Sequence, residues 1–352
     1  MIKTLLVDGD NLFKIGFHGA KDVFNDGAHV GGVFHFVSVL RKFLYEHNHD
    51  KVVVFWDGDS NSSIRKSIYP QYKANRRQDD MNEYKHESYL YQKSRIKQYL
   101  EEIFVRQVEM HDNEADDLIA YYCKISKDEK IIIFSADKDL TQLISEHVTI
   151  YSPITKQYFK NGDMISLNKV DIPHYNVLLT KIFTGDKSDN IEGIQGLGEK
   201  TLVKFFPQVQ EKPCTMEEIL DYARNIPQDK PSKTFTNLLT GKTKTTILGE
   251  EFYTTNKKIV DLTNPLITAD GKELVEQILT DSIDPTDRGY KNLMRMMMED
   301  GLFKYLPKND DAWVNFLTPF MKLTRKEKEI QTKINYERTR QHQNGILIDV
   351  ER

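Results

Sequence analysis

Residues 4–10 have the sequence Thr-Leu-Leu-Val-Asp-Gly-Asp, an apolar run that stops in a turn carrying carboxylates. The pattern recurs at residues 51–59, where Lys-Val-Val-Val-Phe-Trp leads into Asp-Gly-Asp, and at residues 130–139, where Lys-Ile-Ile-Ile-Phe leads into Ser-Ala-Asp-Lys-Asp. Short runs of β-branched residues bounded by turn residues predict buried strands of a parallel sheet. We therefore expect three such strands, each ending in acidic residues.

The stretches between and after these strands complete the fold prediction. Residues 33–45 and 89–104 repeat apolar side chains at helical spacing, and alternating strands and helices predict a doubly wound α/β sheet. Residues 148–152 and 157–160 predict a hairpin, and beyond residue 173 the pattern is mostly helical. The expected fold class is α/β, with a mostly parallel twisted sheet and flanking helices, followed by a helical C-terminal lobe.

Composition restricts the class of protein. The chain has 352 residues, 39% hydrophobic and 29% charged, which is typical of a globular protein and too apolar for disorder. Its two cysteines, Cys123 and Cys214, are far apart and predict free thiols in a reducing compartment. Because we find neither a signal peptide nor an apolar run of membrane-spanning length, we expect a cytoplasmic monomer with no membrane contact.

The acidic residues fall at five places along the chain. Ligands bind at the C-terminal ends of parallel strands, so carboxylates that follow the strands are expected to meet at one edge of the sheet. Each carboxylate alone has a plain structural explanation, such as capping a helix. Together they repel one another and are tolerable only around hard divalent cations such as Mg²⁺ or Mn²⁺. The candidate metal-binding residues are Asp8, Asp57, Glu114, Asp116, Asp117, Asp137, Asp139, Asp186 and Asp189.

Two segments are candidates for contact with nucleic acid. Between residues 65 and 97, nine Lys or Arg stand against four Asp or Glu, although the net charge of the chain is −4. This basic segment suits phosphate groups, and its plainer interpretation is a solvated helix start. Residues 193–200, Gly-Ile-Gln-Gly-Leu-Gly-Glu-Lys, allow a backbone to approach a phosphate closely, although glycine-rich turns before helices are common. The candidates are Lys14, Tyr72, Lys73, Arg76, Gly193, Gly196, Gly198 and Lys200.

Five motifs within residues 1–206 resemble, in order, the acidic motifs of the 5′ nuclease family. That family contains flap endonucleases, phage 5′ exonucleases and the N-terminal nuclease domain of bacterial DNA polymerase I. Stretches at residues 69–76, 151–156 and 256–262 also resemble the ribonucleases H of T-even phages, which belong to this family. The motifs are Leu-Leu-Val-Asp-Gly-Asp-Asn (5–11), Phe-Trp-Asp (55–57), Asn-Glu-Ala-Asp-Asp (113–117), Ser-Ala-Asp-Lys-Asp (135–139) and Thr-Gly-Asp-Lys-Ser-Asp-Asn (184–190).

The resemblance implies roles for the acids and the bases. One Mg²⁺ ion, which Mn²⁺ can replace, would be held by Asp8, Asp57, Glu114 and Asp116, with Asp117 behind them. A second ion would be held or oriented by Asp137, Asp139, Asp186 and Asp189. Two ions together can bind both the attacking and the leaving oxygen of a phosphoryl displacement. Lys73 would neutralise the scissile phosphate and Arg76 a neighbouring one.

The resemblance also implies a domain plan and a set of partners. Residues 1–175 would form the nuclease core, with a basic arch or clamp at about 68–100. Residues 176–310 would hold a helix–three-turn–helix at about 185–206, where K⁺ can bridge to DNA, and a helical DNA-binding lobe. Residues 311–352 would be a helical extension of unknown role. The expected substrates are 5′ flaps, nicked DNA and RNA–DNA hybrids, and the expected partners are a single-strand-binding protein, a sliding clamp or a DNA polymerase, in a bacterial cell or a phage-infected host.

Three alternatives fit parts of the sequence. A phosphatase of the haloacid-dehalogenase type has an Asp-x-Asp after a strand, but it needs a Thr or similar residue where Leu12 stands, and the later acids stay unexplained. A PIN-type ribonuclease has a similar acid set, but it is shorter and lacks the glycine-rich turn. A non-catalytic DNA-binding module gains only repulsion from carboxylates near phosphates. The intact acid set therefore favours a nuclease.

Overall fold

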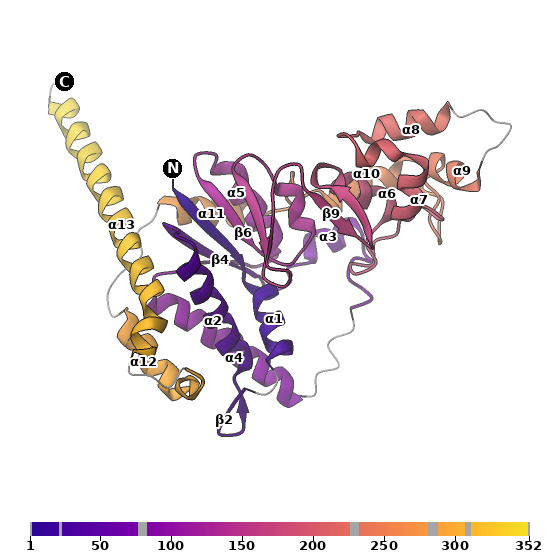
Figure 1. The fold of residues 1–352 in the computed structure, drawn as a ribbon. Coiled ribbons are helices and arrows are strands. Elements are labelled where there is room, and N and C mark those ends of the chain that lie inside the picture. Colours follow the sequence, from indigo (N-terminus) through magenta and orange to yellow (C-terminus); the bar gives the residue numbers. More distant parts are fainter. Residues whose placement is uncertain are drawn as a thin grey trace.

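The computed structural model describes residues 2–20, 23–76, 83–225, 232–280, 288–306 and 311–350. At its centre lies a six-stranded sheet in the order β5-β4-β1-β6-β7-β8, with helices on both faces (Figure 1). The first five strands are parallel, and β8 runs antiparallel to β7. The bounds are β1 Lys3–Asp8, β4 Lys51–Asp57, β5 Arg106–Met110, β6 Lys130–Phe134, β7 Val148–Ser152 and β8 Gln157–Phe159. The three predicted parallel strands and the predicted hairpin are confirmed.

The sequence analysis missed strand β5 and two small hairpins. Strand β5, with the sequence Arg-Gln-Val-Glu-Met, lies at an edge of the sheet beside β4, so it lacks the continuous apolar run of a central strand. The hairpins have strands of two to four residues, too short for a periodic signal. They are β2 Phe24–Asn25 with β3 Ala28–His29, and β9 Met164–Leu167 with β10 Val170–Pro173.

Alternate residues of the central strands supply two apolar cores, one on each face of the sheet. Leu6 and Val53 belong to one core, whereas Leu5 and Val54 belong to the other. Each fully buried side chain of this kind stabilises the fold by about 1.5–3 kcal/mol. The helices of the first core include α3 Ser63–Ile68, α5 Ala115–Ile125 and α6 Val177–Thr184. Those of the second include α1 Gly9–Gly19, α2 Gly31–Glu46, α4 Glu83–Glu102, α12 Tyr290–Glu299 and α13 Ala312–Val350.

The helical lobe after residue 176 shares the first core with the sheet. Leu202, Phe252 and Val275 join Leu6 and Val53 in one apolar cluster, so no break in packing marks the predicted boundary at residue 175. Most of these helices gather at one end of the molecule (Figure 1). Besides α6 they are α7 Glu199–Phe205, α8 Met216–Arg224, α9 Lys233–Leu239, α10 Glu250–Val260 and α11 Ala269–Thr280.

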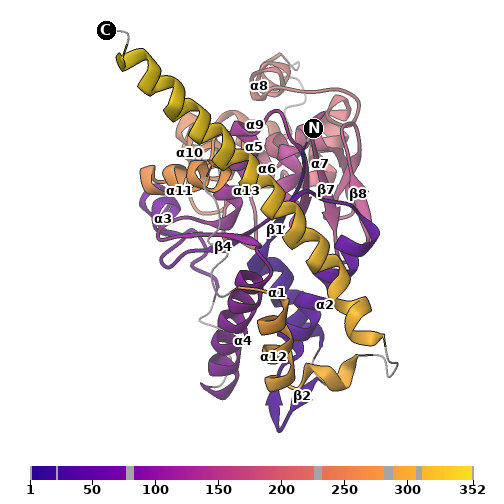
Figure 2. The same ribbon diagram turned by 90° about the vertical axis from the view of Figure 1, so that its left-hand side faces the viewer.

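Helix α12 lies away from this lobe, which corrects the predicted domain boundary at residue 310. It packs beside α4 on the opposite face of the sheet (Figure 2). The buried carboxylate of Asp300, at its end, accepts hydrogen bonds from Arg95 Nε at 2.7 Å and from the Tyr99 hydroxyl on α4. A buried charge is tolerable only when it is paired in this way. The basic segment predicted as an arch at 68–100 therefore ends in helix α4, which Asp300 holds in place through these hydrogen bonds. Residues 77–82 of the segment lie outside the described residues.

The C-terminal helix α13 begins as part of the second core and then leaves the molecule (Figures 1 and 2). Phe316, Phe320 and Leu323 are buried, and Glu327 pairs with Arg106 of β5 at 2.6 Å. The predicted extension at 311–352 is thus a structural helix in its first half. Among the described residues, no helix has the length and apolarity needed to cross a membrane.

Candidate active site

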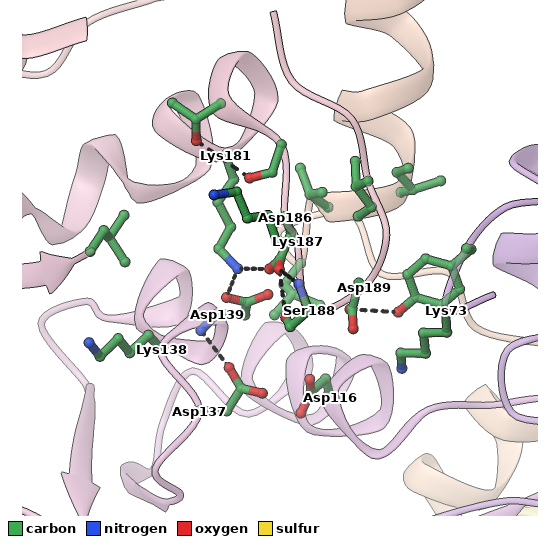
Figure 3. A pocket seen from close by; sticks show the side chains of 18 of the residues that line it. Lys73, Asp116, Asp137, Lys138, Asp139, Lys181, Asp186, Lys187, Ser188 and Asp189 are labelled. Carbon is green, nitrogen blue, oxygen red and sulfur yellow. Dashed lines mark hydrogen bonds and ion pairs between the residues drawn. The ribbon is translucent and has the colours of Figure 1, made fainter. Parts of the chain in front are cut away.

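A cavity of about 760 Å³ opens at the C-terminal edge of the parallel strands. Acids that are far apart in the sequence meet there, because the strand ends, the start of α5 and the loop after α6 converge on this edge. Figure 3 shows Asp116 and Asp137 on one side of the cavity and Lys181 between Asp139 and Asp186 on the other. The predicted site residues that line it are Tyr72, Lys73, Arg76, Glu114, Asp116, Asp137, Asp139, Asp186, Asp189 and Gly198.

Two further predicted acids, Asp8 and Asp57, end strands β1 and β4 just behind the cavity wall. Asp8 caps α1 by accepting the N–H of Asn11 at 3.1 Å, and it also accepts the Ser135 hydroxyl at 2.8 Å. Asp57 accepts the N–H of Ala115 at 3.0 Å, which ties β4 to the start of α5. Burial, together with the nearby Asp57 carboxylate, raises the pKa of Asp8 to about 7.

Asp116 lies among several other carboxylates of the site. Burial and the neighbouring carboxylates, with Asp137 and Asp8 foremost, hold its pKa well above the usual range. Among the described residues, none of Asp8, Asp57, Asp116 and Asp137 forms an ion pair. A group of buried and half-buried acids without cationic partners is unfavourable, and bound cations would relieve the repulsion.

Glu114 and Asp117 are held by one buried arginine that the sequence analysis missed. Arg65 of α3 binds both oxygens of Asp117, at 2.5 and 3.1 Å, and reaches Glu114 at 3.0 Å. Asp117 is fully buried and also accepts the N–H of Leu266 at 2.9 Å. The prediction that Asp117 binds metal is therefore corrected: its oxygens are occupied, and it fixes Arg65 instead. No periodic pattern marks Arg65, which lies in a six-residue helix with an unremarkable sequence.

Tyr72 is also placed differently from the prediction. Its side chain is 2% exposed, and its hydroxyl donates to Glu114 at 3.0 Å and lies 3.1 Å from an oxygen of Asp189. Burial and the nearby Glu114 raise the pKa of Tyr72, so the phenol stays protonated. A ring packed in this way cannot stack on a nucleotide. Tyr72 links the start of α5 to the loop after α6.

The second group of acids contains its own cation. Lys181 of α6 forms ion pairs with Asp139 and, at 2.6 Å, with Asp186. Burial and Asp137 raise the pKa of Asp139 to about 7 even so. Burial acts in the same direction on Asp186, but Lys181 and Ser188 outweigh it and hold the pKa of Asp186 at about 2. The sequence analysis did not select Lys181, although its place one helical turn before Thr-Gly-Asp is a usable signal.

The predicted phosphate-binding bases are paired with site acids in this structure. Lys73 Nζ lies 2.5 Å from Glu114, and Arg76 Nη2 lies 2.5 Å from Asp189. Arg76 is half exposed, so a phosphate can compete for its guanidinium. Lys14 is exposed on α1 and does not line the cavity. A second residue not predicted, Asp10, is buried; it accepts the N–H of Asp57 at 2.8 Å and pairs with Lys93 of α4.

The glycine-rich turn lies between α6 and α7, at the rim of the cavity. A Cβ at Gly193 would lie 2.1 Å from the carbonyl oxygen of Thr184, so a glycine there is required by packing inside the protein. Gly196 has φ +86°, a conformation that favours glycine, and Gly198 caps α7 with open space beside it. Lys200 is exposed on α7.

The donor chemistry of the site fits hard divalent cations, although the ligand cage is not closed. Carboxylate oxygens are the ligands that Mg²⁺ and Mn²⁺ prefer. In the described part of the chain, however, no three acidic, histidine or cysteine side chains converge on one point closely enough to enclose an ion. Lys181 fills the space between Asp139 and Asp186, and Lys73 binds Glu114. Binding of an ion near Asp8, Asp57, Asp116 and Asp137 therefore needs side-chain rotation, and binding at Asp139 and Asp186 needs displacement of Lys181.

Comparison with known proteins identifies relatives of this chain. Residues 3–170 match the family model described as "5′-3′ exonuclease, N-terminal resolvase-like domain". The 5′-3′ exonuclease of Halalkalibacterium halodurans is 29% identical over 302 residues, which are 80% of this chain and 90% of that protein. DNA polymerase I of Bacillus subtilis is 28% identical over 225 residues, 62% of this chain, and the thermostable DNA polymerase I of Thermus aquaticus is 31% identical over 237 residues, 65% of this chain. The chain spans about a quarter of the length of these polymerases, 24% and 26%.

A solved structure shows the same fold. The bacteriophage T5 D15 flap endonuclease, crystallised in a complex with DNA and metal ions, superposes with a TM-score of 0.61 at 21% identity, over 84% of this chain and 99% of the phage protein. The segment that matches the family model, residues 3–170, contains the three strand ends and the start of α5, and with them seven of the nine predicted acids. From the family-model match and the curated relatives, residues 3–170 of this chain are the N-terminal domain of a 5′-3′ exonuclease, and the chain has the fold of the phage flap endonuclease.

Proposed function

We propose that this chain is a structure-specific 5′ nuclease that hydrolyses phosphodiester bonds near the 5′ end of DNA flaps, nicked duplexes or RNA primers paired with DNA. The observation that carries the proposal is a group of buried and half-buried carboxylates that form no ion pair with any described residue, at a cavity rimmed by Lys73 and Arg76. The group consists of Asp8, Asp57, Asp116 and Asp137. Acids without counter-ions suit metal binding, and flanking bases suit phosphates. A role in primer removal or repair follows from that substrate class.

Each part of the site has a distinct task in this proposal. The four unpaired acids would hold one Mg²⁺ or Mn²⁺, and Asp139, Asp186 and Asp189 would hold or orient a second. When bound, the cations lower the pKa of the attacking water and offset charge at the phosphate. Lys73 and Arg76 exchange Glu114 and Asp189 for phosphate oxygens and orient the scissile bond. Arg65 and Tyr72 keep Glu114 in place meanwhile.

We also propose a monovalent cation site, protein partners and a place of action for this chain. A K⁺ ion at the turn 193–198 would join the protein to a duplex phosphate. A single-strand-binding protein, a sliding clamp or a DNA polymerase would deliver the chain to its substrate. The working place would be the cytoplasm of a bacterial cell or a phage-infected host, with the chain acting as a monomer.

A 5′ flap substrate labelled at its 5′ end tests the proposal directly. We expect short labelled products with Mg²⁺ or Mn²⁺ and none with EDTA, because the four unpaired acids repel a phosphate unless cations are bound between them. Product lengths separate stepwise exonuclease cutting from cutting at the junction, and a parallel substrate with an RNA 5′ strand measures the preference for RNA. Binding without any cleavage under both metals would contradict the proposal and favour a non-catalytic DNA-binding protein.

The internal cation yields a prediction about the second metal site. Replacing Lys181 by Met removes a charge that the second ion must displace, so the affinity of the weaker Mn²⁺ site should rise by about tenfold or more. Isothermal titration calorimetry with Mn²⁺ measures both sites without turnover. Lys187→Met is the matched control, since Lys187 lines the same cavity but forms no ion pair among the described residues. Equal Mn²⁺ affinities in wild type and Lys181→Met would show that Lys181 does not compete with the ion.

A further inference from the structure

A compact hairpin loop of residues 240–249, Thr-Gly-Lys-Thr-Lys-Thr-Thr-Ile-Leu-Gly, has no role in the site described so far. Its ends are paired, since Lys242 and Ile247 form an antiparallel bridge and Gly249 N–H donates to Thr240 O at 3.0 Å. The buried Thr243 hydroxyl accepts the N–H groups of Thr245 and Thr246, at 3.2 and 3.1 Å. The loop is therefore pre-organised, and it loses little conformational entropy when a ligand binds to it.

This loop is docked on the glycine-rich turn at the rim of the cavity. Gln195 N–H donates to Lys242 O at 2.9 Å, and Asn237 Nδ2 donates to Gln195 O at 2.9 Å. The Thr245 hydroxyl donates to Glu192 at 2.8 Å. Because Ile191 and Gly198 of the same turn line the cavity, the loop continues the surface that begins there.

The chemistry of the loop suits phosphate groups. Residues 232–249 contain three lysines and no acidic residue, although the whole chain carries a net charge of −4. Lys244 is exposed and Lys242 partly so, and neither forms an ion pair in the described ranges. Lysine ammonium and threonine hydroxyl groups contact phosphate oxygens without regard to base sequence. Helix α7, next along the turn, adds exposed Lys200 and Lys204 on one helical face.

The loop has no aromatic residue, and this favours a duplex over a single strand as its ligand. Binding of single strands uses aromatic rings on which bases stack. No aromatic residue lies between Phe235 and Phe252, and both of these rings pack inside the protein. Contacts from the loop are therefore confined to a backbone, which a duplex presents on its outer surface.

We propose that residues 240–249 form a second duplex-binding surface, in which Lys242 and Lys244 contact phosphates of the DNA whose cleaved strand lies in the cavity. The inference rests on the proposed nuclease function and extends its duplex footprint past the glycine-rich turn. It also explains the rigidity of the loop, because a phosphate contact that is fixed in place sets the distance from duplex to cut.

The test is DNA binding by fluorescence anisotropy in Ca²⁺ or EDTA, with flap substrates whose duplex arm is shortened step by step. The variant is Lys242→Ala/Lys244→Ala. The control, Lys322→Ala/Lys333→Ala, removes the same charge from exposed positions on α13. With the long arm, log affinity falls as log salt concentration rises, and we expect this dependence to be less steep in the variant than in the wild type. Each lost phosphate contact should reduce the steepness by about 0.9, so the two lost contacts should reduce it by about 1.8. The loss should shrink as the arm shortens, and the control should match wild type.

An unchanged salt slope on the long arm, or an equal loss in the control, would overturn the proposal, and exposed Ile247 would then point to a protein partner instead. Cleavage of the same substrates by wild type in Mg²⁺ separates the two claims. If the wild type never cleaves but shows the expected steeper salt dependence than the variant, the nuclease function is contradicted and the duplex-binding surface is supported. If wild type cleaves and the variant binds normally, only the duplex surface fails.

Discussion

Replacing Asp116 by Asn should lower turnover on a 5′ flap on the order of 10³-fold, about 4 kcal/mol of transition-state stabilisation. Asp116 lies in the first turn of α5, on the same side of the cavity as Asp137 (Figure 3). An amide retains the shape of the side chain but not the charge that holds a divalent cation. Single-turnover kinetics at saturating Mg²⁺ measure the loss of the chemical step without product release.

The same substitution should make the metal-free protein more stable. Burial and four neighbouring acids raise the pKa of Asp116, so its ionised form is unfavourable in the folded state. Above the ordinary carboxyl pKa, Asp116→Asn removes this repulsion, and thermal unfolding in EDTA at neutral pH should occur at a higher temperature. Asp59→Asn is the control, because Asp59, in the turn after β4, is exposed and does not line the cavity. A stabilised Asp116→Asn with wild-type turnover would contradict its role as a metal ligand.

Replacing Arg65 by Ala should destabilise the fold by about 3–5 kcal/mol, a large part of a typical stability of about 5–15 kcal/mol. Arg65 is 4% exposed and pairs with both Asp117 and Glu114. Its loss leaves the buried Asp117 without the cation that pairs with it and leaves Glu114 with Lys73. Urea unfolding followed by circular dichroism measures the change. Arg65→Lys keeps the charge but not the two parallel hydrogen bonds to Asp117, and we expect an intermediate loss.

Arg76→Ala is the matched control for this prediction. Arg76 also pairs with a site acid, Asp189, but its side chain is 52% exposed, and exposed pairs contribute about 1 kcal/mol or less. We expect Arg76→Ala to weaken flap binding while leaving the free energy of unfolding almost unchanged. Equal destabilisation by the two alanine variants would show that burial of Arg65 does not decide its contribution.

The family and most of the acids could be predicted from the sequence because their signals are local. A β-branched run that ends in carboxylates specifies a buried strand and its C-terminal edge within about ten residues. For this reason the positions of Asp8, Asp57, Asp137 and Asp139 at this edge can be predicted from the sequence. The edge strand β5 was missed because its mixed polar sequence lacks a continuous apolar run.

Ion pairs between residues that are far apart in the sequence could not be predicted. Arg65 meets Asp117 across 52 positions, and Lys93 meets Asp10 across 83. Neither pair follows a spacing rule, because each depends on how two helices pack on the sheet. The same packing buries Tyr72, which changes a predicted nucleic-acid contact into a hydrogen-bond donor for Glu114.

The sequence alone thus determined that this chain places a set of carboxylates at one edge of a parallel sheet. The pattern that specifies a strand, and the carboxylates that follow it, both lie within a few neighbouring residues of the sequence. Only the tertiary structure decided which carboxylates are free. Asp117 forms an ion pair with Arg65, and Asp139 and Asp186 both form ion pairs with Lys181. Asp116 and Asp137 form no ion pair in the described part of the chain. The physical reason is that charge compensation depends on distance in space and on burial, and neither quantity is a property of sequence spacing.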